Sequence, residues 1–188
     1  MTKSSASKLA FAVSLVNLIF SVYTYATYYE FTGLFLILTI VLSSAAVGST
    51  IGFGGLSFYS TAKSAFCGVL LFNLVIYLIM NVTAATVVAV GSATSKVSIF
   101  GMLQLPCVVA AIVVCFLSFY MPGRLPKKAS FITAVCVSAL FLVLCVYEII
   151  NGIGADARVI IYNILQHIQV AVIAWYPYLS GEYRVDKI

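Results

Sequence analysis

Polar side chains gather in one apolar stretch of the chain, between residues 159 and 179. Asn163, Gln166 and His167 recur at helical spacing and share one face of a helix, and Gln169 lies about one turn beyond Gln166. Polar groups in hydrocarbon are costly unless paired, so they turn toward another helix or toward water. The pattern predicts either an interhelical hydrogen-bond seam or the lining of a solute pathway or pocket. Candidate seam partners in other apolar stretches are Asn17, Asn73 and Gln104.

Two titratable residues, one in this stretch and one before it, could take part in a pathway. In a pathway, His167 would act as a pH-sensitive gate, because imidazole titrates near neutrality. Glu148 ends the preceding apolar stretch and is the best carboxylate for a proton or cation site. Its structural alternative is a salt bridge to Arg158 across a short loop.

A second pattern consists of small residues at four-residue spacing. Ser44, Gly48 and Gly52 fall on one face of a helix, where small side chains let two helix backbones approach closely. The face predicts helix packing, either within the chain or with a second subunit, as a homo-oligomer or with other membrane subunits.

The sequence lacks the usual motifs of catalytic and metal-binding sites. The single histidine excludes bis-histidine haem, and the five acidic residues are scattered. The five cysteines form no closely spaced pair and lie in apolar runs, as small buried hydrophobes do. P-loop, dinucleotide and nucleophile-elbow motifs are absent from the sequence. We therefore expect no enzyme, no metal and no cofactor.

Composition defines the class of protein in which these residues lie. Of 188 residues, 63% are hydrophobic and 8% charged, against about 45–50% and about 25% in soluble domains. A water-soluble fold of this size cannot hide so much apolar surface, so lipid must be its solvent. The net charge of +5 is not gathered on a basic, aromatic-rich face, which argues against nucleic-acid binding.

The apolar residues form six stretches, each long enough to cross a bilayer as a helix of about 20 residues. Their predicted bounds are 9–29, 33–55, 65–90, 99–120, 130–150 and 159–179. The sequence therefore predicts an all-α, polytopic transmembrane helical bundle, with residues 1–188 as a single integral membrane domain.

Basic residues predict the orientation of this bundle. Six spans place eight basic residues on one side of the membrane, and only Lys96 and Arg158 on the other. The eight are Lys3, Lys8, Lys63, Arg124, Lys127, Lys128, Arg184 and Lys187. Because cytoplasmic loops carry the excess of Lys and Arg, both termini are predicted to be cytoplasmic. Asn81 begins a glycosylation acceptor pattern, but it lies in or just beyond the third stretch, where lipid prevents modification.

Two functions fit these features. The first is a small transport, channel-like or solute-binding membrane component that uses the polar face of the last stretch. The alternative is a non-catalytic structural or accessory subunit, held in a larger membrane assembly through the Gly48/Gly52 face. Fold alone does not decide between them, because six spans occur in proteins of unrelated function.

Overall fold

The chain is all-helical, as the sequence predicts. The computed structural model describes residues 3–30, 32–34, 36–37, 45–59, 63–91, 99–121, 123–151 and 156–180. These residues form six helices: α1 (Lys3–Thr27), α3 (Ala45–Phe58), α4 (Lys63–Gly91), α5 (Ile99–Tyr120), α6 (Lys127–Asn151) and α7 (Ala157–Ser180). Helices suit such apolar sequences, because they satisfy every backbone hydrogen bond inside the segment and need no water.

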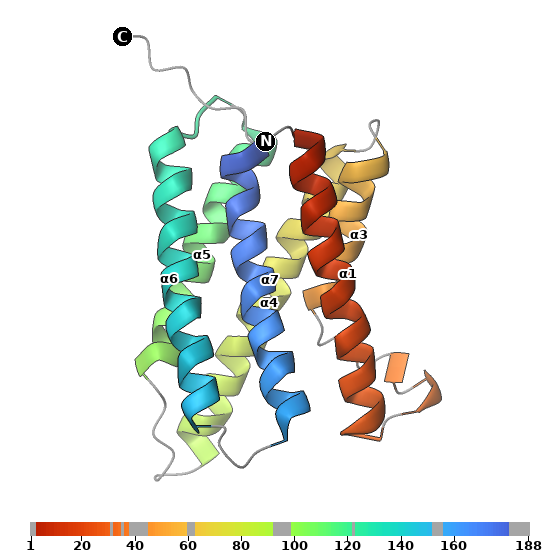
Figure 1. Ribbon diagram of the computed structural model, residues 1–188. Coiled ribbons are helices and arrows are strands. Elements are labelled where there is room, and N and C mark those ends of the chain that lie inside the picture. The colour runs from red at the N-terminus through yellow and green to blue at the C-terminus, as the bar shows by residue number, and fades with distance from the viewer. Residues whose placement is uncertain are drawn as a thin grey trace.

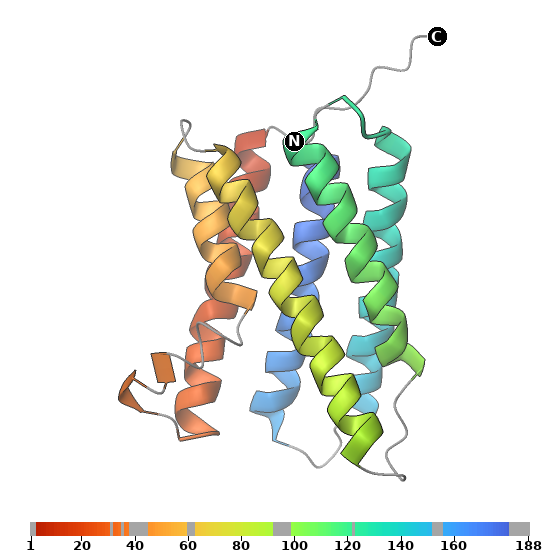
Figure 2. The same ribbon diagram turned by 180° about the vertical axis from the view of Figure 1, so that it is seen from behind.

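The helices pack in two layers. Figure 1 shows α6, α7 and α1 side by side in one layer, with α5, α4 and α3 behind them. Figure 2 shows the second layer from its own side, with α4 crossing the bundle diagonally. Neighbours in sequence pack together, and α7 closes the arrangement by packing between α6 and α1 while also contacting α5 and α3.

Successive helices run in opposite directions, which gives the bundle two chemically different ends. At one end α1, α4 and α6 begin and α3, α5 and α7 finish; we call this the basic end (Figure 1). Its helix starts and connection carry exposed basic side chains, namely Lys8, Lys63, Arg124, Lys127 and Lys128. At the other end, where α5 and α7 begin, lie Asp156 and Arg158; we call this the Asp156 end.

Three helices are long and apolar enough to cross a membrane, over Ser5–Thr27, Lys127–Tyr147 and Ala157–Ser180. Three further apolar helical stretches are shorter where side chains as well as backbone are described, namely Ala46–Phe58, Lys63–Ile79 and Gln104–Tyr120. α3 is described from Ala45 and continues to Phe58, past the predicted end of the stretch 33–55. Residues 38–44, which include Ser44, lie outside the described residues.

The distribution of side chains is that of a protein dissolved in lipid. Large apolar side chains point outward, as in Ile19 (62% exposed), Phe72 (65%) and Leu142 (67%). Many polar side chains point inward, which reverses the pattern of a water-soluble protein. The buried polar residues are Ser7, Ser14, Asn17, Ser21, Thr24, Ser49, Asn73, Gln104, Ser118, Ser130, Gln166, His167 and Gln169. Hydrocarbon outside the bundle explains both observations.

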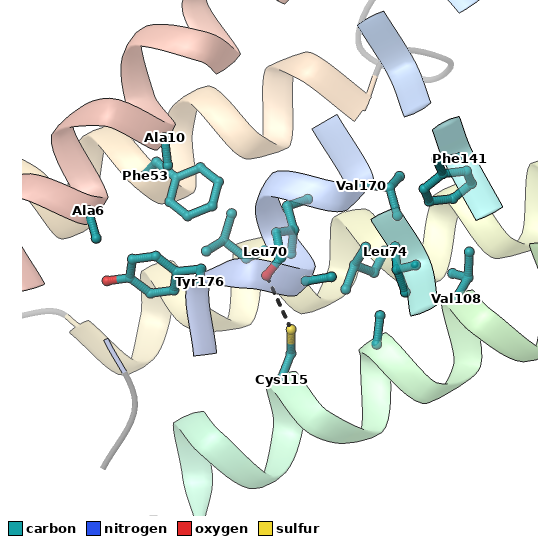
Figure 3. Close-up of a cluster of buried hydrophobic side chains, with 14 of the residues drawn as sticks. Ala6, Ala10, Phe53, Leu70, Leu74, Val108, Cys115, Phe141, Val170 and Tyr176 are labelled. Carbon is teal, nitrogen blue, oxygen red and sulfur yellow. Dashed lines mark hydrogen bonds between the residues drawn. The ribbon is translucent and has the colours of Figure 1, made fainter. Parts of the chain in front are cut away.

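An apolar core fills the part of the bundle between α7 and the layer behind it (Figure 3). Phe53 and Tyr176 meet edge to face at one side of this core, and Phe141 and Val170 lie at its other side. Cys115 is buried within it and donates a hydrogen bond from its thiol to the carbonyl of Ile173. The cysteine prediction holds for Cys67 and Cys115, which are buried, whereas Cys136 is exposed.

Candidate functional site

A buried polar stripe on α1 faces the polar residues of α7. Ser7, Ser14, Asn17, Ser21 and Thr24 are all buried, at intervals of seven, three, four and three residues. These intervals are whole helical turns, so the five side chains lie along one face of α1. Of these five residues, only Asn17 was predicted from the sequence as a seam partner. The recurrence of polar residues at helical spacing could have indicated the other four. However, short hydroxyl side chains in an apolar helix usually bond to their own backbone, so their spacing alone does not predict a seam.

Toward the basic end, this stripe bonds to α7 in three places. The hydroxyls of Ser7 and Tyr176 are 3.0 Å apart. Gln169 donates from Nε2 to Ser14 Oγ at 2.9 Å and accepts at Oε1 from Asn17 Nδ2 at 3.4 Å. Gln169 is fully buried, so α1 supplies both the acceptor and the donor that its amide needs.

The same seam continues toward the Asp156 end. Gln166 donates from Nε2 to Asn17 Oδ1 at 3.2 Å and to Ser21 Oγ at 3.4 Å. Farther along, the hydroxyls of Tyr25 and Tyr162 are 3.0 Å apart. The pairs follow one another in the order expected of two antiparallel helices in a single register. We call this set of α1 and α7 side chains the polar zipper.

His167 points away from the zipper, into a junction of four helices. Its ring stacks on Phe141 of α6, with centroids 5.2 Å apart and planes 12° from parallel. Its Nδ1 lies 3.5 Å from the hydroxyl of Tyr77 on α4, and that hydroxyl donates to Gln104 Oε1 of α5 at 3.3 Å. We call Tyr77, Gln104, Phe141 and His167 the His167 layer.

The His167 layer lies one helical turn from the apolar core. Tyr77 follows Leu74 by three residues and His167 precedes Val170 by three, on helices that run in opposite directions. Both therefore lie on the Asp156 side of Leu74 and Val170. Most of the core lies between this layer and the basic end, whereas Phe141 belongs to both and Leu144 lies on the Asp156 side of the layer.

Two polar side-chain atoms of α7 have no hydrogen-bond partner among the described residues. They are Gln166 Oε1 and His167 Nε2, and both side chains are only 8% exposed. Thr24 Oγ1 of α1 is also buried without a hydrogen-bond partner among the described residues. Most buried polar groups in proteins are paired, so an unpaired one calls for an explanation such as a bound molecule. This condition could not be read from the sequence.

The structure divides the face that the sequence predicted on α7. Gln166 and Gln169 bond to α1, whereas His167 turns to α4 and α6, and Asn163 is half-buried. Of the expected seam partners, Asn17 joins the zipper and Gln104 joins the His167 layer. Asn73 instead donates to Ser49 Oγ on α3 at 2.6 Å.

The charged residues near α7 pair over a shorter distance than the sequence analysis considered. Arg158 binds Asp156, with Nη2 and Oδ2 2.6 Å apart, and its guanidinium lies 5.5 Å from the ring centroid of Tyr28. The hydrogen bonds from Arg158 lower the pKa of Asp156 from its ordinary value. Glu148 lies within helical α6, but its side chain is outside the described part of the chain, as is that of Asn81.

The glycine face of α3 packs against α4 of the same chain. A Cβ added to Gly48 would come within 3.0 Å of Asn73, and one added to Gly52 within 2.6 Å of Leu70. The face therefore has the geometry expected for helix packing within the chain. Within the described ranges, no three His, Cys, Asp or Glu side chains gather as metal ligands would.

Comparisons with known proteins place no further constraint on these sites. No protein family model, curated protein or solved structure matches the chain.

Proposed function

We propose that the chain is an integral membrane protein with six spans and its basic end in the cytoplasm. The alternating helix directions and the apolar outward faces support this arrangement. Five basic side chains are exposed at the basic end, and at the other end Arg158 is paired with Asp156.

Cysteine labelling in intact cells tests this topology. A membrane-impermeant maleimide should label Asp156→Cys from outside, and label Arg124→Cys only after the cells are opened. The unsubstituted chain, with its own five cysteines in apolar segments, provides the background. Labelling of Arg124→Cys in intact cells would contradict the orientation.

We further propose that the protein is a transport or solute-binding component whose site is the His167 layer. The observation that carries this function is the unpartnered Nε2 of His167, buried where four helices meet. Leaving a buried polar group unpaired costs about 1–3 kcal/mol, and a bound solute would remove this cost. The apolar core on the basic side of the layer would be the barrier that a solute must pass during transport.

The polar zipper favours a structural role for Gln166 and Gln169. Both side chains are committed to α1, so they hold the bundle together and do not line an open pathway. This separates the two roles that the sequence placed on one face. If the His167 layer binds nothing, the accessory-subunit function is the one that remains.

Flux into proteoliposomes tests the transport function. Purified protein in neutral lipid vesicles should raise the rate of swelling in urea or glycerol gradients, followed by light scattering. His167→Leu should reduce this increase at least tenfold, whereas Ile168→Leu, on the exposed side of the same helix, should leave it unchanged. Swelling no faster than in protein-free vesicles would overturn the transport function.

A further inference from the structure

We propose that His167 Nε2 is the acceptor of a site for a small, uncharged molecule that donates a hydrogen bond. The inference rests on the proposed function and names its ligand class, for which water and urea are the simplest members. The position of the proton on the imidazole ring determines which hydrogen bonds His167 can make.

The contacts of Tyr77 fix the tautomer of His167. The Tyr77 hydroxyl has one hydrogen, which it donates to Gln104 Oε1, an atom that can only accept. Toward His167, the same oxygen must therefore accept. The hydrogen of the neutral ring then lies on Nδ1, the nitrogen 3.5 Å from the Tyr77 hydroxyl. Nε2 is left with a lone pair and no hydrogen.

That lone pair defines what can bind. Nε2 is buried and unpartnered among the described residues, so a molecule that enters the layer and donates a hydrogen would satisfy it. A ligand that offers only acceptors, such as a carboxylate, is excluded by this chemistry.

The surroundings favour an uncharged donor over a cation. Residues 64–91, 99–121, 129–147 and 159–180 contain no Asp, Glu, Lys or Arg, and Glu148 follows Phe141 by seven residues, about two helical turns toward the Asp156 end. A cation beside His167 would therefore lack a counter-charge from these parts of α4, α5, α6 and α7. Moving an ion into such a medium without a partner costs several kcal/mol even after relaxation. A neutral donor such as water or urea avoids this cost.

The close contacts of the layer favour a small ligand. His167 lies directly on the Phe141 ring, and Tyr77 approaches Phe141 edge to face with centroids 6.5 Å apart. A ligand with one or two hydrogen-bonding groups is enough to satisfy Nε2. Single waters satisfy buried polar groups in other proteins in the same way.

Nitrogen NMR tests the site directly, because the chain has only one histidine. With ¹⁵N-histidine protein in nanodiscs, we expect Nδ1 to be protonated and Nε2 to give a pyridine-type signal. That signal should show magnetisation transfer from water, or shift on titration with urea. Tyr77→Phe should make the Nε2-protonated tautomer detectable, whereas Tyr23→Phe, on an exposed face of α1, should not.

The outcomes separate this inference from the proposed function. Protonated Nε2 in the unsubstituted protein, or a signal that responds to neither water nor urea, would overturn the site. A response to methylammonium alone would overturn the uncharged class. If the signal responds as expected and the vesicles show no added flux, the inference stands and transport fails. If flux occurs and Nε2 is protonated, transport stands and the inference fails.

Discussion

Replacing Asn17 tests whether the polar zipper holds α1 in the bundle. Asn17 is 1% exposed and makes three side-chain hydrogen bonds to α7, to the carbonyl of Leu165, to Gln169 Oε1 and from Gln166 Nε2. Interhelical hydrogen bonds in membrane proteins average about 0.6 kcal/mol. Losing all three in Asn17→Ala should therefore lower the free energy of unfolding by about 2 kcal/mol.

The assay is unfolding in mixed detergent micelles by increasing sodium dodecyl sulfate, followed by the fluorescence of Trp175. This is the only tryptophan, and it reports on α6 and α7 because its Nε1 donates to Ser138 Oγ at 2.7 Å. Val16→Ala is the matched control, because Val16 adjoins Asn17 and is 59% exposed. We expect this control to change the free energy by less than about 0.5 kcal/mol.

A double-mutant cycle isolates the pair at the centre of the zipper. Asn17→Ala and Gln166→Ala remove the two ends of the 3.2 Å bond between Gln166 Nε2 and Asn17 Oδ1. We expect a coupling free energy of about 0.6 kcal/mol, and at most about 1.7 kcal/mol. The reasoning is refuted if Asn17→Ala lowers the free energy of unfolding no more than Val16→Ala does, and if the effects of Asn17→Ala and Gln166→Ala on that free energy are additive.

Two further predictions concern the glycine face and the Asp156 end. Gly52→Ala should lower the free energy of unfolding in the same assay by about 1–3 kcal/mol, because the new Cβ would lie 2.6 Å from Leu70 Cγ; stability equal to that of the unsubstituted chain would remove this face from α3–α4 packing. The lowered pKa of Asp156 means that its pairing with Arg158 contributes stability at pH above about 4, which is lost as the pH falls through the folded-state pKa. Asp156→Asn should therefore reduce the acid-induced fall of the unfolding midpoint, and an unchanged pH profile would argue against the pair.

The helix bounds were largely predictable, because apolar run length is a direct property of the sequence. The stretch 99–120 matches α5, and 65–90 lies within α4, which extends it by only a few residues at its start and one at its end. The end of the second stretch was less well predicted, because the apolar residues Leu56 and Phe58 continue α3 past residue 55.

The partners of the polar residues were not predictable from spacing alone. Gln166 and His167 are adjacent and about 100° apart around α7, so they can share a broad polar face or face different neighbours. In this protein they face different neighbours, because α7 packs between α1 and α6. Tyr77 and Phe141 belong to the His167 layer, but each lies in an ordinary apolar run, and only the packing of four helices brings them to His167.

The polar zipper has a consequence for how the protein is made. Asn17 bonds to Gln166, which follows it by 149 residues. At about 5–20 residues per second, a ribosome needs roughly 7–30 seconds to produce that partner. During this interval the amide of Asn17 and the hydroxyls around it have no α7 to bind, although α1 has already left the ribosome. An insertion chaperone that shelters α1 until α7 arrives would act in this window, and a chain truncated before α7 would display the polar stripe to quality-control proteases.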